Sequence, residues 1–259
     1  PLDFFGSKYN NFLLNDFFPK EWIVMWYNAV EVKIVMKKML IIGGTGGIGR
    51  EMTKSFSNKY EVLSYSSKTF DITNFRFLEK FFHVNSFDII LNASGFNYDS
   101  YLHKYDEESM CEVDKIIDVN IKGNINLLST CLPMMRKQGF GRIILMSSVL
   151  STMPVPGTSV YSASKAFMDS LIKTATIENL SKGITCNSIQ LGYFDAGMAH
   201  RIPDAMLNKI IQKVPLKRLG KMVELENTIE LLINTEYISG TSIKINGGIC
   251  LWITEMIFI

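Results

Sequence analysis

The chain of 259 residues is 47% hydrophobic and 20% charged, which is typical of a folded domain and excludes a disordered chain. Its formal net charge of +2 gives no general attraction to nucleic acid, so we expect no nucleic-acid partner. No apolar run reaches the ~18 residues of a membrane span, so we expect no membrane partner and a cytoplasmic location. The wide spacing of the cysteines predicts thiols of a reducing compartment and no metal site: Cys111, Cys131, Cys186 and Cys250.

Residues 1–35 stand outside the pattern of the rest of the chain. They are rich in Phe, Tyr, Trp and Asn and contain no strand followed by a helix. Two interpretations of this extension stay open. It anchors the protein to a membrane or a partner, or it is upstream sequence carried in by a misplaced start. In either case we expect the folded domain to cover residues 36–259, since Met36 stands just before the first expected strand.

From Lys38 onward, short apolar runs alternate with longer amphipathic stretches. Strands are expected at 38–42, 61–65, 88–91, 142–147, 184–190 and 242–245. Helices are expected from 48 and at 75–82, 109–136, 160–180, 205–212 and 222–233, with Pro133 bending or ending the long third helix. This alternation predicts a single α/β domain, a doubly wound Rossmann-type parallel sheet with helices on both faces.

A glycine-rich turn joins the first strand to the first helix. Glycines let the backbone approach a pyrophosphate, and the free N–H groups at the start of the helix face the anion. A glycine motif alone is also typical of a flexible turn, so the interpretation depends on the other motifs. The turn predicts a dinucleotide-binding site made by Gly43, Thr45, Gly46, Gly47, Ile48 and Gly49.

The end of the second strand indicates which dinucleotide is bound. An acidic residue there would bind the ribose 2′-hydroxyl of NAD(H). The sequence instead places the hydroxyl of Ser66 and the amine of Lys68 there, which suit a 2′-phosphate, so NADP(H) is favoured over NAD(H). Asp71 follows Tyr65 almost directly, which leaves little room for a helix after this strand.

Tyr161 and Lys165 form the most informative pair in the sequence. At positions i and i+4 of a helix they project from one face. We expect the ammonium, together with the positive ring of an oxidised nicotinamide, to lower the pKa of Tyr161 and make it an acid/base. Ser148 ends the strand that precedes this helix, at the edge where open α/β sheets bind ligands, whereas its neighbour Ser147 points to the opposite face.

In this order, the motifs resemble those of the short-chain dehydrogenase/reductase family over about residues 38–250. The resemblance implies that Ser148 binds the substrate oxygen and that Tyr161 is the acid/base. It implies that Lys165 binds the cofactor ribose and that Asn120 holds a water in a proton relay. Besides Tyr161 and Lys165, it implies cofactor contacts at Asp71, Ile72, Asn92, Ala93, Ser94, Gly95 and Gly192.

The sequence departs from the family pattern at three positions. Ile42, Leu191 and Ala196 stand where Thr, Pro and Thr are usual, and the last two lie in the segment expected beside the nicotinamide. The departures at Leu191 and Ala196 keep a second interpretation open, in which the protein is a catalytically weak or inactive nucleotide-binding scaffold or regulatory protein. The intact set of Ser148, Tyr161 and Lys165 favours the enzyme.

The resemblance implies hydride transfer between nicotinamide and a small-molecule carbonyl or secondary alcohol. The motifs resemble most those of 3-oxoacyl-[acyl-carrier-protein] reductases and of related sugar or polyol dehydrogenases. The segment 193–212 is the expected lid over the substrate. The resemblance also implies a homo-oligomer, a dimer or a tetramer, in which the helices at 109–136 and 160–180 pair between subunits.

Overall fold

The computed structural model describes residues 36–197, 199 and 202–250. By its internal contacts the chain divides after Met36, and the fold below is that of the second part. The prediction for residues 1–35 lies outside the described residues. Within the described ranges, no helix is both long and apolar enough to cross a membrane, and no group of three or more His, Cys, Asp or Glu side chains is placed to hold a metal ion.

Six parallel strands form one sheet in the order β2-β1-β3-β4-β5-β6. The three middle strands β3, β4 and β5 are buried on both faces, which is why their sequences lack the alternation of a half-buried strand. All six expected strands are confirmed, and their ends differ by at most one residue from the expected ones. They are β1 (Lys38–Ile42), β2 (Glu61–Tyr65), β3 (Ile89–Asn92), β4 (Gly141–Ser148), β5 (Ile184–Leu191) and β6 (Ser242–Ile245).

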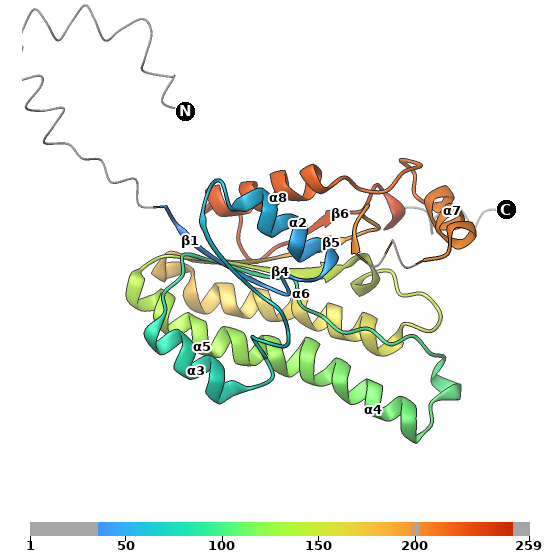
Figure 1. Cartoon of the computed structure of the whole chain (residues 1–259), viewed down its shortest axis with the longest axis horizontal. Coiled ribbons are helices and arrows are strands. Elements are labelled where there is room, and N and C mark those ends of the chain that lie inside the picture. The colour runs from blue at the N-terminus through green and yellow to red at the C-terminus, as the bar shows by residue number, and fades with distance from the viewer. Residues whose placement is uncertain (1–35, 198, 200–201, 251–259) are drawn as a thin grey trace, which may run out of the picture. The chain divides into compact units, whose positions relative to one another are not determined.

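Helices cover both faces of the sheet, so the predicted doubly wound fold is confirmed (Figure 1). Side chains of β1 alternate between the two cores: Met39 and Ile41 pack on one face, and Leu40 and Ile42 on the other. The first face is covered by α2 (Gly47–Phe56) and α8 (Met222–Asn234). The second carries α3 (Phe75–Val84), α4 (Glu107–Ile116), α5 (Gly123–Gln138) and α6 (Ser159–Asn179), while α7 (Asp204–Lys213) follows β5.

The long helix expected at 109–136 has an irregular middle. It begins as α4, passes through the π-helical segment η2 (Ile117–Lys122) and continues as α5. Pro133 does not end it, so that part of the prediction is wrong. Proline removes only one backbone donor, and the buried face of α5 holds the helix on the core. The helix ends at Gly139, whose φ of 69° lies in the left-handed region that favours glycine.

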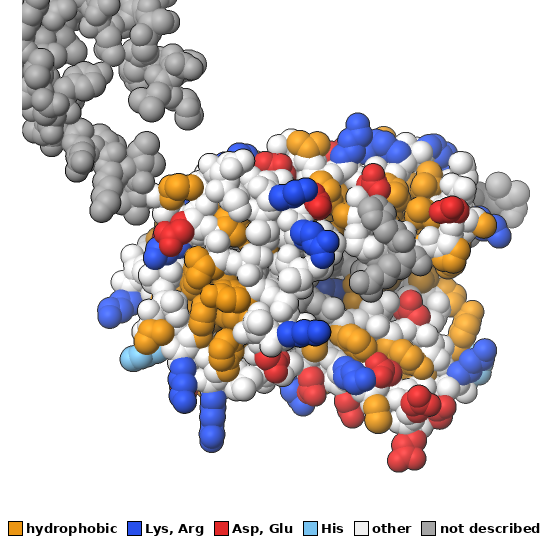
Figure 2. Space-filling view, viewed as in Figure 1, with side chains coloured by type: hydrophobic (Ala, Val, Ile, Leu, Met, Phe, Trp, Pro, Cys, Tyr) orange, Lys and Arg blue, Asp and Glu red, His pale blue; other side chains and the backbone are white. Residues whose placement is uncertain are grey.

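β2 forms an open edge of the sheet, and the described segment between Tyr65 and Phe75 contains no helix, as the sequence predicts. Apolar side chains gather on the face seen in Figure 2, in the region where β2 and α3 lie in Figure 1. Packed rings fill the space that a further helix would otherwise cover. These rings are Tyr65, Phe70, Phe77, Phe81, Phe82 and Phe87.

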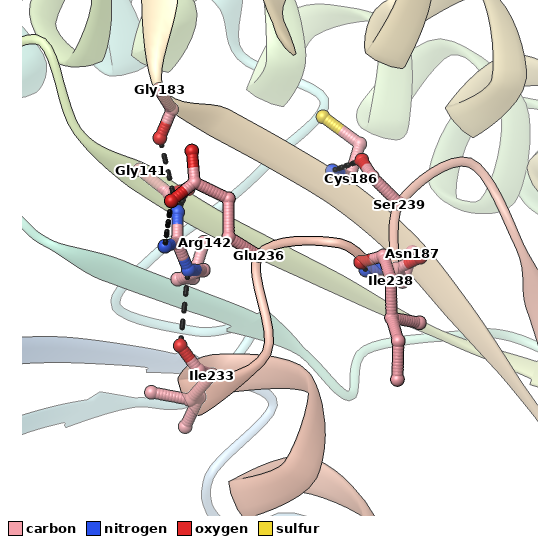
Figure 3. Close-up of polar contacts among 9 residues, drawn as sticks. All are labelled: Gly141, Arg142, Gly183, Cys186, Asn187, Ile233, Glu236, Ile238 and Ser239. Atoms are coloured by element: carbon pink, nitrogen blue, oxygen red, sulfur yellow. Dashed lines mark hydrogen bonds and ion pairs between the residues drawn. The ribbon is translucent and has the colours of Figure 1, made fainter.

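Arg142 joins the amino-terminal end of β4 to the last turn of α8 (Figure 3). It is buried, and its Nε donates to the carbonyl of Ile233 at 3.0 Å. Its Nη1 donates to the carbonyls of Gly141 at 2.9 Å and Gly183 at 3.0 Å. Burial lowers the pKa of Arg142, and the carboxylate of Glu236, 3.9 Å away, opposes that change. One buried cation therefore satisfies three carbonyls at the end of the sheet opposite its ligand-binding edge.

Candidate active site

The strand order reverses between β1 and β3, and open α/β sheets bind ligands beyond the carboxyl ends of the strands at such a point. The glycine turn follows β1, and residues 92–95 end and follow β3. Ser148 ends β4, and Gly192 follows β5. The sheet therefore brings four of the predicted segments to one edge.

Tyr161 and Lys165 lie in the first two turns of α6, and both are buried. The Nζ of Lys165 lies 5.5 Å from the centroid of the Tyr161 ring and donates to the carbonyl of Met146 at 2.8 Å. The side chain of Ser148 forms a hydrogen bond with Tyr161. Ser147 instead donates to the carbonyl of Lys165 at 3.3 Å. The structure thus brings Ser148, and not Ser147, to the tyrosine.

Burial sets the proton affinities of this pair. It raises the pKa of Tyr161 to about 12, while the hydrogen bond with Ser148 acts in the opposite direction and the negative charge of Asp99 adds to the rise. Burial also lowers the pKa of Lys165 to about 8, and the carboxylate of Asp169 opposes that change. The protein's own groups therefore do not produce the expected lowering of the Tyr161 pKa, because the loss of hydration outweighs the hydrogen bond with Ser148.

Asn120 lies in the π-helical segment η2, packed against the loop that follows β3. Its Oδ1 accepts from the N–H of Phe96 at 2.9 Å, and its Nδ2 donates to the Phe96 carbonyl at 2.8 Å and to Ser164 Oγ at 3.0 Å. A Cβ built on Gly95 would lie 3.4 Å from Lys165 Nζ and 3.6 Å from Asn120 Oδ1. The space beside Gly95 is therefore bounded by both predicted relay residues.

Residues 92–95 are held by their own polar side chains. The Nδ2 of Asn92 donates to Asn124 at 2.9 Å, and its Oδ1 accepts from the N–H of Ser94 at 3.0 Å and from the Ser94 hydroxyl at 2.6 Å. The N–H of Ala93 donates to the carbonyl of Ile42 at 2.9 Å, which fixes this segment beside the start of the glycine turn. The backbone beyond β3 is thus preorganised by contacts within the protein.

Several glycines of the predicted site are required by the packing of the chain on itself. Gly43 has a φ of 82°, and a Cβ there would lie 2.8 Å from the backbone of Ala93. A Cβ on Gly47 would clash with Gly197, and one on Gly49 with the Gly43 carbonyl. Gly46 is different, because the nearest atom to a Cβ would be the Gly43 carbonyl oxygen at 3.2 Å. The exposed Thr45 and Gly46 are therefore the residues of this turn with open space beside them.

Gly192 is also required by packing. A Cβ on Gly192 would lie 2.7 Å from the Cα of Asn246, and its N–H donates to the carbonyl of Ile245 at 2.8 Å. This contact ties the segment after β5 to the end of β6.

The end of β2 lies against the glycine turn, because the N–H groups of Gly43 and Gly44 donate to the carbonyl of Tyr65 at 3.0 and 2.9 Å. Ser66, the next residue, is half-buried, and Lys68 is exposed. Ser66 therefore lies close to the turn, and Lys68 follows it by two residues in the chain.

The side chains of Asp71 and Ile72, in contrast, make their contacts within the protein. The carboxylate of Asp71 accepts from the N–H and the hydroxyl of Thr73 at 2.9 and 2.7 Å. The side chain of Ile72 is buried, and a Cβ on Gly123 would lie 2.7 Å from it. Asp71 thus shapes the turn before α3, and Ile72 packs its side chain into the core.

Comparison with known proteins identifies the family to which the chain belongs. The sequence model of the family described as Enoyl-(Acyl carrier protein) reductase matches residues 65–250. The chain belongs to the short-chain dehydrogenase/reductase family. It is 34% identical over 165 residues to the 3-oxoacyl-[acyl-carrier-protein] reductase FabG of Staphylococcus epidermidis, a match that spans 63% of this chain and 66% of the relative.

Another relative of this short-chain dehydrogenase/reductase matches over a longer stretch. The 3-oxoacyl-[acyl-carrier-protein] reductase FabG of Rickettsia felis is 28% identical over 239 residues, covering 84% of this chain and 98% of the relative. The crystal structure of levodione reductase has the same fold, with a TM-score of 0.75 and 21% identity over 83% of this chain and 98% of that structure.

The sequence interpretation of this short-chain dehydrogenase/reductase missed four polar residues that follow the carboxyl ends of the strands. Asp99 and Tyr193 are close enough to raise the pKa of Tyr161. In the described part of the chain, Asn97 Oδ1 and Ser151 Oγ are buried without a hydrogen-bond partner. The available signal was position, since all four follow the carboxyl ends of β3, β4 or β5 closely. Three residues of the expected lid lie outside the described residues: Met198, His200 and Arg201.

Proposed function

We propose that the protein transfers hydride reversibly between a nicotinamide dinucleotide and a carbonyl or secondary alcohol, with Tyr161 as the acid/base. The observation that carries the proposal is the buried contact of Ser148 with Tyr161, beside the ammonium of Lys165. Such a set can hold a substrate oxygen and exchange a proton with it. The nicotinamide, when bound, supplies or accepts the hydride.

The residues at the carboxyl edge of the sheet fit such a dinucleotide. α2 begins at Gly47, and no side chain caps its first N–H groups, which leaves them for a pyrophosphate. The backbone at Thr45, Gly46 and Ile48 would hold that group. Residues 92–95 and Lys165 would hold the ribose on the nicotinamide side, where the bare Cα of Gly95 leaves space next to the ammonium. Gly192 would hold the ring.

In the reducing direction, the hydroxyls of Ser148 and Tyr161 donate hydrogen bonds to the substrate carbonyl. Because burial holds the pKa of Tyr161 at about 12, this residue is protonated at neutral pH and serves as the acid. Lys165 then stabilises the phenolate that remains. A water between Lys165 and Asn120 would return the proton to Tyr161 from the solvent side.

We propose NADP(H) as the preferred cofactor, supported by the half-buried hydroxyl of Ser66 and the exposed amine of Lys68 beside the glycine turn. Replacing Lys68 by Glu is expected to weaken NADPH binding by about tenfold, because one charged hydrogen bond to the 2′-phosphate is lost. NADH affinity should change little. Fluorescence titration of both cofactors measures this, with Lys54→Glu on α2 as a charge-matched control. Tighter binding of NADH by the wild type would contradict the assignment.

The relatives suggest which substrate to test first. Because two matched relatives are 3-oxoacyl-[acyl-carrier-protein] reductases, we propose a 3-oxoacyl thioester as substrate. Oxidation of NADPH by acetoacetyl thioester, compared with simple ketones, tests the proposal. If the protein binds the cofactor but reduces nothing in a broad carbonyl panel, the scaffold interpretation motivated by Leu191 and Ala196 is favoured instead.

We also propose that the protein is a homo-oligomer, supported by large apolar side chains that stand exposed on α5 and α6. Ile125 is 44% exposed and Ile177 is 83% exposed. A partner surface that covers them would remove apolar area from water. Light scattering on the full chain should give a dimer or tetramer, and the mass of a monomer at all concentrations would refute this.

A further inference from the structure

Asp169 lies one helical turn beyond Lys165 on the same face of α6. It is buried, with 8% of its surface exposed. Its Oδ1 accepts from the hydroxyl of Ser188 at 2.6 Å, and its Oδ2 accepts from the Nε2 of Gln190 at 2.7 Å. Both donors lie on β5, so the carboxylate is fixed between the catalytic helix and the sheet.

Neither donor neutralises the carboxylate, because a hydroxyl and an amide carry no net charge. A buried charge needs an opposite charge nearby. Lys165 is the buried cation of this face, 4% exposed, and the hydrogen bond from its Nζ goes to the neutral carbonyl of Met146. We propose that Asp169 is a positioning residue that keeps the ammonium of Lys165 charged and oriented while it is shielded from water. The kinetic part of this proposal rests on the proposed function.

Among the groups around Asp169 and Lys165, the dominant charge interaction is the one between these two residues. From α6, Tyr161 and the exposed Lys173 flank the pair one turn away on either side. From β6, Lys244 is exposed to water beside Gln190, its register partner, so its charge is screened. The remaining neighbours are neutral at physiological pH: Met146, Ser147 and Ser148 from β4, Cys186, Ser188 and Gln190 from β5, Ser242 from β6 and Asn120 from η2.

Gln190 makes a clean test possible. Its Oε1 is buried without a hydrogen-bond partner in the described structure, while its Nε2 serves Asp169. In an Asp169→Asn variant the side-chain amide of Gln190 can rotate, so that its oxygen accepts from the new amide. Ser188 can still donate to the remaining carbonyl oxygen. The substitution therefore removes the charge and retains the hydrogen bonds.

Urea unfolding at several pH values tests the proposal without any catalytic readout. Lys165 has a folded-state pKa of about 8, below its ordinary value, and loss of the carboxylate should lower it by about a further unit. The variant should then be less stable than wild type at pH 6, where Lys165 is charged in both proteins. The difference between the two free energies of unfolding should shrink as pH rises to about 9.5, where Lys165 is neutral in both folded proteins. A difference that stays constant from pH 6 to 9.5 would overturn the proposal.

The pH profile of kcat/KM for carbonyl reduction gives the second readout. In the wild type, kcat/KM should fall above about pH 8 as Lys165 loses its proton. In Asp169→Asn this alkaline limb of the profile should lie about one pH unit lower. Ser242→Ala, which removes the hydroxyl 2.8 Å from Ser188 but keeps the carboxylate, should leave the limb in place. Coincident limbs in Asp169→Asn and wild type would refute the positioning role. Failure of the wild type to reduce any carbonyl would instead count against the proposed function, and the unfolding result would still decide the role of Asp169.

Discussion

Replacing Tyr161 by Phe is expected to lower kcat/KM for carbonyl reduction by about 10²- to 10⁴-fold. The variant keeps the ring that packs near Lys165 Nζ and loses only the hydroxyl that we propose exchanges a proton with the substrate oxygen. Steady-state oxidation of NADPH at pH 7 measures the loss. Because the ring remains, NADPH affinity and the midpoint of thermal unfolding should stay close to those of wild type.

Tyr193→Phe is the matched control for this experiment. Tyr193 is a half-buried tyrosine whose pKa is raised by burial and by Asp99, in the neighbourhood of Tyr161. Its hydroxyl takes no part in the proposed proton transfer, so its removal should change kcat by less than about tenfold. Equal losses of activity in the two variants would contradict the assignment of Tyr161 as the acid/base. Unchanged turnover in Tyr161→Phe would rule out the acid/base mechanism.

Replacing Arg142 by Met is expected to lower the free energy of unfolding by about 3 kcal/mol. The substitution leaves the carbonyls of Gly141, Gly183 and Ile233 without their charged donor, and methionine fills most of the same volume. Urea unfolding followed by circular dichroism measures the loss. Arg142 lies at the end of the sheet away from the active site, so the KM of the folded variant should be unchanged.

Arg136→Met is the control for charge and size. Arg136 is exposed, and its Nη1 donates to the carbonyl of Glu178 at 3.0 Å and to Asn179 Oδ1 at 2.8 Å. Water can replace these bonds, so the loss of stability should stay below about 1 kcal/mol. Equal losses at Arg136 and Arg142 would show that burial of Arg142 adds nothing to stability.

The strands could be predicted from sequence almost to the residue, because each is a short apolar run that begins and ends at polar or glycine-rich segments. The π-helical segment Ile117–Lys122 could not, since its residues fit an α-helix equally well and the irregularity is selected by contacts made elsewhere. Asn120 reaches Phe96 and Ser164, which lie 24 residues before and 44 residues after it in the chain. The helix ends at Gln138, two residues beyond the expected end, because the buried face of α5 continues past Pro133.

In the candidate site, residues within one motif could be predicted, and residues that meet only through the fold could not. Tyr161 and Lys165 share a helix face, and Ser148 ends a strand, so local geometry was sufficient to predict that these side chains lie close together. The contacts of Asp169 with Ser188 and Gln190 join α6 to β5 and leave no mark in the spacing of either segment. The rise that the protein alone produces in the pKa of Tyr161 could not be predicted either, because it depends on burial that no motif reveals.

The π-helical segment also has a genetic consequence. A π-helical turn holds one residue more than an α-helical turn, so it can arise or disappear through the gain or loss of a single codon while the helices on either side keep their faces. Deletion of one codon within Ile117–Lys122 would leave α4 and α5 packed on the sheet but shift Asn120 away from Phe96 and Ser164. A lineage that carried such a deletion would keep a folded protein and lose the proposed proton relay, which would be a short mutational path from an enzyme to a nucleotide-binding scaffold.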